Sequence, residues 1–173
     1  MSTNRHLVEP ASDLLVDYIE ANIAAALTSI RADRNAVQNL GLPTPIPREY
    51  FIARSYMALQ TPAIFVVCDS IDFKKDRGAN HINATAKYGI AAISEGLNTE
   101  DVTRITWRYQ AALSQILDNL SLTSADNTFS IRVIVKSAEF LEEYDTSSQG
   151  NNTAKRWRKG VQLKCDVEFY EAL

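Results

Sequence analysis

The stretch VQLKCDVEFY at residues 161–170 decides the fold class, because apolar and polar side chains alternate along all of it. A period of two places alternate side chains on opposite faces of a β-strand. A second alternating run precedes it, with Phe129, Ile131, Val133 and Val135 on the apolar side. We therefore predict a long C-terminal β-hairpin over residues 129–170. The polar stretch 142–157 is its expected mobile tip, and the outer half of the hairpin is expected to leave the core.

Outward from this hairpin, the pattern predicts strands at residues 49–56, 63–69 and 81–93, with a solvated turn over residues 70–80. Apolar residues at three- and four-residue steps predict a helix over residues 12–31, capped by Ser12 or Asp13. A second helix is expected to begin at Asn98 or Thr99, with Trp107 and Arg108 off its apolar stripe. The expected fold class is α+β, a single mixed or antiparallel sheet of about five strands flanked by two helices. Residues 1–173 are expected to form one domain.

Two segments are expected to lie outside this core, a flexible N-terminus at residues 1–11 and a Pro-rich linker at residues 32–48. The linker holds Gly41, Pro43, Pro45 and Pro47, and alternating prolines favour extended backbone. A stiff spacer between helix and sheet is the favoured interpretation, and a ligand for a partner protein is the alternative.

Composition narrows the function classes. The net charge of -3 and the pI near 5.4 argue against a general nucleic-acid binder, which usually carries a basic stripe. The isolated Cys68, Cys165, His6 and His81 give almost no support for a metal site. No signal peptide or membrane-spanning stretch is expected, so the protein is expected to be made in a reducing cytoplasm, with no cofactor and no membrane partner.

The familiar catalytic motifs are not found in the sequence. Carboxylates at Glu139, Glu142, Glu143 and Asp145 have the chemistry for acid–base work or for Mg²⁺. They fall where the hairpin arm is expected to leave the core, so a solvated arm is favoured over an active site. We expect the protein not to be an enzyme.

The hairpin arm carries most of the expected partner-binding residues. The acids listed above lie on one limb of the hairpin. The other limb carries a basic run, made of Lys155, Arg156, Arg158 and Lys159. The two sets are expected to pair across the hairpin or with a neighbouring copy. Exposed apolar residues on such an arm predict a partner, unless loop 31–48 folds back over them. Trp107 is an interface candidate, with packing under a loop as the alternative. The interface candidates are Trp107, Phe140, Leu141, Glu142, Glu143, Tyr144, Asp145, Lys155, Arg156 and Trp157. Lys74, Lys75, Asp76 and Arg77 are candidates for a charged loop or lumen.

The organisation of the chain resembles that of the lambda-type tail terminator proteins of long-tailed phages. The segments that carry the resemblance are PAIFVVCDS at 62–70, INATAKYGIAAI at 82–93, YQAALSQIL at 109–117, IRVIVKSAEFLEEYD at 131–145 and WRKGVQLKCDVEFYEAL at 157–173. The resemblance implies a virion protein that forms a hexameric ring, caps the tail tube and joins it to the neck or head-completion proteins. DNA would pass through the lumen without specific binding.

Two alternatives stay open. A head-completion or other neck or minor tail subunit would share this layout. A small-molecule-binding or enzymatic α+β domain is the alternative from another class, although its candidates, Asp72, His81 and Glu95, show no helpful spacing.

Overall fold

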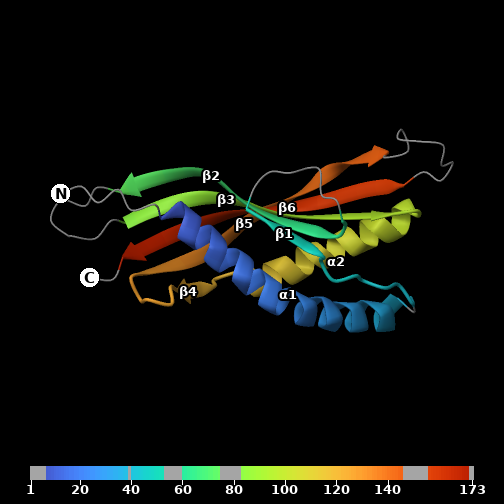
Figure 1. Cartoon of the computed structure of the whole chain (residues 1–173). Coiled ribbons are helices and arrows are strands. Elements are labelled where there is room, and N and C mark those ends of the chain that lie inside the picture. Colours follow the sequence, from blue (N-terminus) through green and yellow to red (C-terminus); the bar gives the residue numbers. More distant parts are fainter. Residues whose placement is uncertain (1–6, 39, 53–59, 75–82, 146–155, 172–173) are drawn as a thin grey trace.

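The computed structural model describes residues 7–38, 40–52, 60–74, 83–145 and 156–171. Two helices, α1 (Val8–Gln38) and α2 (Thr99–Leu117), accompany one six-stranded sheet (Figure 1). Its strands are β1 (Glu49–Phe51), β2 (Ala63–Lys74), β3 (Asn83–Gly96), β4 (Ser121–Thr123), β5 (Phe129–Asp145) and β6 (Trp157–Glu171). The order across the sheet is β1-β2-β3-β6-β5-β4, with β1 parallel to β2 and every other pair antiparallel. The predicted α+β class with one mixed sheet and two helices is confirmed.

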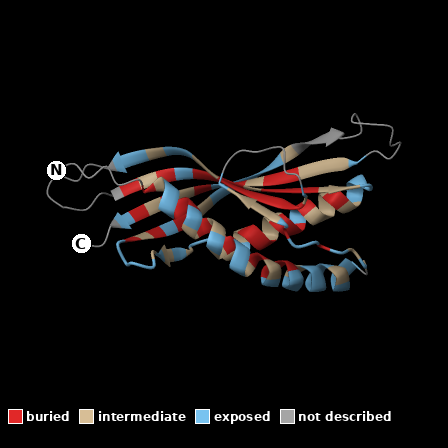
Figure 2. Cartoon of the chain, in the orientation of Figure 1, coloured by how far each residue is buried: buried red, intermediate tan, exposed pale blue. Residues whose placement is uncertain are grey.

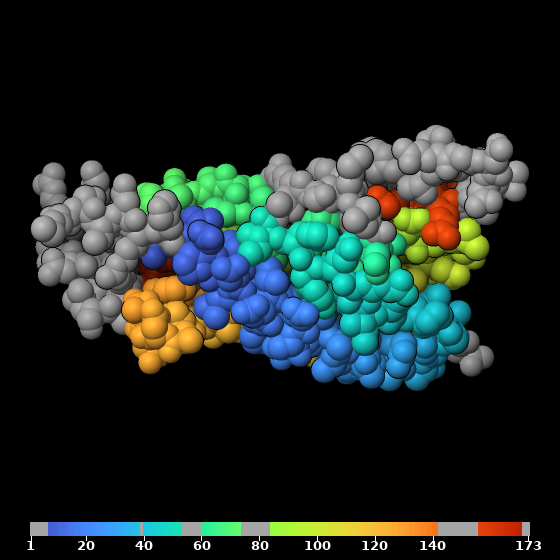
Figure 3. Space-filling model, in the orientation of Figure 1, coloured from blue at the N-terminus to red at the C-terminus, as the bar shows by residue number. Residues whose placement is uncertain are grey.

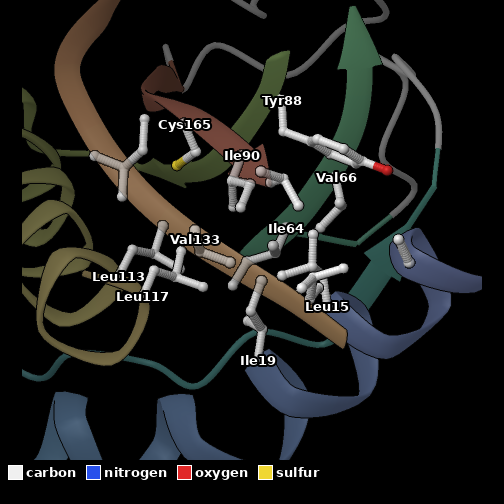
Figure 4. Packing of buried hydrophobic residues seen from close by; sticks show 14 of the residues in the cluster. Leu15, Ile19, Ile64, Val66, Tyr88, Ile90, Leu113, Leu117, Val133 and Cys165 are labelled. Carbon is white, nitrogen blue, oxygen red and sulfur yellow. The ribbon is translucent and has the colours of Figure 1, made fainter. Parts of the chain in front are cut away.

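Both helices cover the same face of the sheet, and the main core lies between them and the strands (Figure 2). The predicted alternation of β6 is confirmed, since Val161, Leu163, Cys165, Val167 and Phe169 are all buried. Figure 4 shows how helix and strand side chains meet there, with Leu15 and Ile19 on α1 and Leu113 and Leu117 on α2 facing Ile64, Val66, Ile90 and Val133.

The opposite face of the sheet has a small apolar cluster of its own. Phe51 and Phe65 stack there with ring centroids 5.2 Å apart, and Ile93 packs beside them. The cluster extends toward β5, because the Cδ1 atom of Leu141 lies over Gly160, where an added Cβ would approach it to 2.9 Å. A glycine at this position therefore lets Leu141 reach across β6.

α1 is longer than predicted at both ends. It begins at Val8, so the supposedly flexible segment is helical from that residue on. Pro10 fits in the first turn, where its missing N–H would have no acceptor inside the helix. Ser12 is not the cap: its hydroxyl donates to Val8 O at 2.7 Å and lies 3.1 Å from the hydroxyl of Tyr88 in the core. At the other end the helix runs to Gln38, so the linker begins later than residue 32.

The ends of two strands also differ from the prediction. β2 continues to Lys74, so residues 70–74 are strand and not turn; Ser70 pairs with Lys87 and Lys74 with Asn83. A register shift between Cys68 and Ser70 interrupts the alternation there, which hides the continuation from pattern analysis. β1 is three residues long, and residues 53–56 of its predicted span lie outside the described part.

The outer half of β5 leaves the core, as predicted, since residues 136–140 are all exposed, but it does not leave the sheet. β5 stays paired with β6 as far as Asp145, which lies opposite Trp157. Residues 142–145 and Trp157 of the predicted tip therefore belong to strands, and residues 146–155 lie outside the described residues. Loop 31–48 does not cover the arm, since Phe140 remains 55% exposed.

Candidate partner-binding surface

α2 positions the centre of the candidate surface, and its start is set locally. Asn98, one of the two residues predicted as the cap, is the N-cap. Its Oδ1 accepts hydrogen bonds from the backbone N of Glu100 at 2.9 Å and of Asp101 at 3.4 Å. A side-chain acceptor at this position satisfies N–H groups that have no partner within the helix. Trp107, nine residues after this cap, is 53% exposed.

Trp107 forms part of a groove between α2 and β5, which we call the α2–β5 groove. Its volume is about 250 Å³, and it is lined by Thr103, Thr106, Trp107, Phe140, Leu141, Lys159 and Gly160. Lys159 Nζ donates to Thr103 Oγ1 at 2.6 Å and ties β6 to the helix. Trp107 and Phe140, two interface candidates 33 residues apart in sequence, are thus brought to one groove. Both present more than half of their surface to solvent.

The other side of Trp107 faces a second groove, between α1 and α2. This α1–α2 groove has a volume of about 300 Å³ and is lined by Ile30, Arg34, Gln38, Arg104, Trp107, Arg108, Gln110 and Ala111. Arg104 is held on its wall by Glu100 Oε1 at 2.6 Å and by Gln38 Oε1 at 3.3 Å. Since Trp107 lines both grooves, they form one continuous surface with an apolar end and a basic end.

Arg108 lies beneath the basic end and is only 4% exposed, which corrects the prediction that it falls outside the buried stripe. Its guanidinium donates to Leu42 O at 2.9 Å, Thr44 Oγ1 at 2.8 Å and Asn35 Oδ1 at 2.7 Å. These three acceptors are neutral. Burial lowers the pKa of Arg108, and the nearby charges of Arg104, Arg31 and Arg34 lower it further. The linker is therefore a fixed part of the structure, held against α2 by this arginine and by the hydrogen bond from Tyr109 to Pro45 O.

The charged residues of the hairpin make contacts that the sequence did not indicate. Glu95 on β3 binds Arg158 at 2.9 Å and Arg156 at 3.4 Å, so both basic residues reach the strand beside the hairpin. One predicted acid does pair across the hairpin, because Glu139 on β5 lies 2.5 Å from Lys164 on β6. Exposed pairs of this kind contribute little stability.

The remaining candidates are only partly placed. The backbones of Glu142, Glu143, Tyr144 and Asp145 belong to β5, but their side chains lie outside the described residues. Trp157 starts β6 and is half-buried. Lys74 ends β2, and Lys75, Asp76, Arg77 and Lys155 lie outside the described residues.

The described residues that were considered for a small-molecule site do not converge. Asp72 lies opposite Thr85 at one end of β3, and Glu95 lies near the other end and is engaged by two arginines. His81 lies outside the described part. Within the described ranges, no three residues of the His, Cys, Asp and Glu types gather as a metal site would require. Nor does any described helix combine the length and apolarity needed to span a bilayer.

Sequence reasoning found the aromatic residues of this surface and missed its arginines. Trp107 was recognisable because a large aromatic residue lay off the apolar stripe of an amphipathic helix. Arg34, Arg104 and Arg108 converge only when α1 and α2 pack together, and nothing in their local sequence indicates this.

Comparisons with known proteins leave the family open. No family model and no curated protein matches the chain. One solved structure, described as "Virion of native gene transfer agent (GTA) particle", contains a chain similar to this one at 16% sequence identity. The match covers 87% of this chain and 94% of that chain, with a TM-score of 0.29, which is too low to show a common fold.

Proposed function

We propose that this protein is a structural component of a phage virion, a tail terminator whose copies form a ring that caps the tail tube and joins it to the neck. The observation that carries the proposal is the continuous surface around Trp107. There two aromatic side chains from different elements stand exposed beside one groove. Exposed aromatic residues in a groove are typical of the centres of protein–protein interfaces.

The position of the surface suits a ring. It is built from both helices and from the hairpin, and so it lies on the helical side of the sheet. A surface that binds a different surface on the next copy makes a head-to-tail contact, and such contacts close into rings when the rotation allows. A hexamer of chains with net charge -3 would be acidic overall, and a bore lined by acids would let DNA pass without holding it.

The role proposed for the hairpin is contact with the tail tube. β5 and β6 are 17 and 15 residues long, about three times an average strand, and they pair from Phe129 to Asp145 with two register shifts. A stiff paired arm of this kind holds its end in a defined place. A head-completion or other neck role uses the same arm and surface, and it differs only in which neighbour the arm meets.

The proposal is tested by light scattering coupled to size-exclusion chromatography, over a range of protein concentrations and with purified tail tubes. A discrete oligomer, alone or on tubes, is expected. Replacing Trp107 and Phe140 together by alanine should abolish it, whereas Phe73→Ser should not, because Phe73 is equally exposed at the far end of β2. A protein that stays monomeric under all conditions and ignores both tubes and neck proteins would refute the proposal.

A further inference from the structure

The solvent-facing side of α1 has a strong charge polarity. Glu9, Asp13, Asp17 and Glu20 are all exposed on its N-terminal half. At 3.6 residues per turn they fall within an arc of about 80°, and Arg31 and Arg34 fall close to the same arc. Along this side of α1, the charged residues are therefore acidic toward the N-terminus and arginines toward the C-terminus. Figure 3 shows α1, in blue, running obliquely across the outer surface of the molecule.

The helix dipole does not account for this pattern. Its influence is confined to about the first and last turn, and only Glu9 lies in the first turn of α1, while no basic residue lies in the last. Asp13 and Asp17 instead follow Glu9 at four-residue steps, and like charges at this spacing destabilise a helix. The acidic side therefore costs the isolated chain some stability.

Within the described residues of one copy, the charges at the two ends of α1 have few partners of opposite sign. None of the four carboxylates lies within salt-bridge distance of a cationic group in that part of the chain. At the other end, Arg31, Arg34, Arg104 and Arg108 gather around the α1–α2 groove, and Glu100 is the carboxylate seen to pair there. A rise of 1.5 Å per residue puts Glu9 and Arg34 about 37 Å apart, so one copy cannot bring its own ends together.

We propose that the acidic side of α1 in one copy docks against the α1–α2 groove of the next copy, which makes a head-to-tail contact. This inference rests on the proposed ring and names the surfaces that form it. Both surfaces lie on the helical layer, so the contact leaves the opposite face of the sheet free. The charges select the partner and the register, while Trp107 on the wall of the groove supplies apolar area to bury.

Two charge-reversed variants test the contact. One is Asp13→Lys with Asp17→Lys, and the other is Arg31→Glu with Arg34→Glu. All four positions are exposed, so each variant should give the circular dichroism spectrum of the wild type, and its melting temperature should be no lower because the substitutions remove like-charge pairs. Each alone should need an at least about tenfold higher concentration to assemble, because like charges now face each other. Asp33→Lys is the matched control, since Asp33 is exposed on another side of the same helix.

The decisive measurement is an equimolar mixture of the two variants. Each variant carries the partner charge for the other, so the mixture should assemble as the wild type does, into a ring of alternating copies. If either variant alone assembles as readily as the wild type, or if the mixture fails to assemble, the proposed contact is wrong while the proposed ring still stands. Wild-type protein that assembles neither alone nor on tubes would instead overturn the proposed function, and the contact with it.

Discussion

Replacing Arg108 by methionine tests the most unusual feature of the helical layer, a buried cation with neutral acceptors. The substitution keeps most of the aliphatic stem and removes the guanidinium that holds Leu42, Thr44 and Asn35. Two effects oppose each other. Removing a buried charge relieves a desolvation cost, whereas removing three hydrogen bonds releases the linker from α2.

The surroundings decide which effect is larger. Leu42 O keeps a hydrogen bond from Asn35 Nδ2 at 3.2 Å, and Asn35 is half-exposed, so water can replace the lost donor. Thr44 is 6% exposed and loses the donor to its hydroxyl, which costs about 1–3 kcal/mol. Removing the cation also relieves its desolvation and the repulsion from Arg31, Arg34 and Arg104, which offsets only part of the loss because the linker loses its hydrogen bonds to α2 as well. We expect a net loss of about 2 kcal/mol, and a fall in Tm of about 4–8 °C for a domain of this size.

Urea denaturation followed by circular dichroism measures the change, with limited proteolysis of the linker as a second readout. Arg104→Met is the matched control, because Arg104 lies one turn earlier on the same helix and is partly exposed, with an exposed partner in Glu100. It should cost less than about 1 kcal/mol. If Arg108→Met proves as stable as the wild type, with an unchanged m-value, the relief of desolvation dominates and the linker is held by other contacts.

Two further predictions concern other parts of the chain. Gly160→Ala should destabilise the protein by about 1–3 kcal/mol in urea denaturation, because its Cβ would approach backbone and packed side-chain atoms. Gly89→Ala should cost less, since the closest atom there belongs to the flexible end of Gln162; equal losses would contradict this reasoning. Asp126 accepts hydrogen bonds from Ser124 and Thr128, which lower its pKa to about 2. Because its folded pKa is lowered, its contribution to stability is present above pH 3.8 and is lost as the pH falls toward about 2. NMR titration should give a midpoint well below the ordinary range, and a midpoint near 4 would contradict these contacts.

The elements that sequence analysis predicted well are those whose signals are local. The N-cap at Asn98 acts on its own first turn, and the alternation of β6 is complete because that strand lies inside the sheet with one face in the core. β4 was missed because it has three residues and buries little. Its pairing with β5 depends on the register of a strand that comes later in the chain.

The C-terminal extension of α1 could not be predicted from periodicity. Residues 32–38 are almost entirely exposed, and even Val37 is 79% exposed, so no apolar stripe marks them as helix. Their helical state is consistent with a tertiary contact, the hydrogen bond between Asn35 and Arg108. For the same reason Arg108 was placed outside the core, since an arginine beside an apolar stripe is normally exposed.

The open edges of the sheet explain why the helical layer is the better candidate for the contact between copies. β1 covers three residues of β2, and β4 covers three residues of β5, so both long strands leave most of an edge unpaired within the described part of the chain. Each of these strands also has breaks in its register. The break in β2 lies between Cys68 and Ser70, and those in β5 lie between Val135 and Ser137 and between Leu141 and Tyr144. Bulges interrupt the ladder, and charged residues at an edge discourage another strand from adding. The residues skipped here are all of charged types, namely Asp69, Lys136, Glu142 and Glu143. Edges protected in this way resist unlimited strand addition. A contact made by side chains on α1 and α2 can close at a fixed number of copies, because its geometry is set by the packing of those helices.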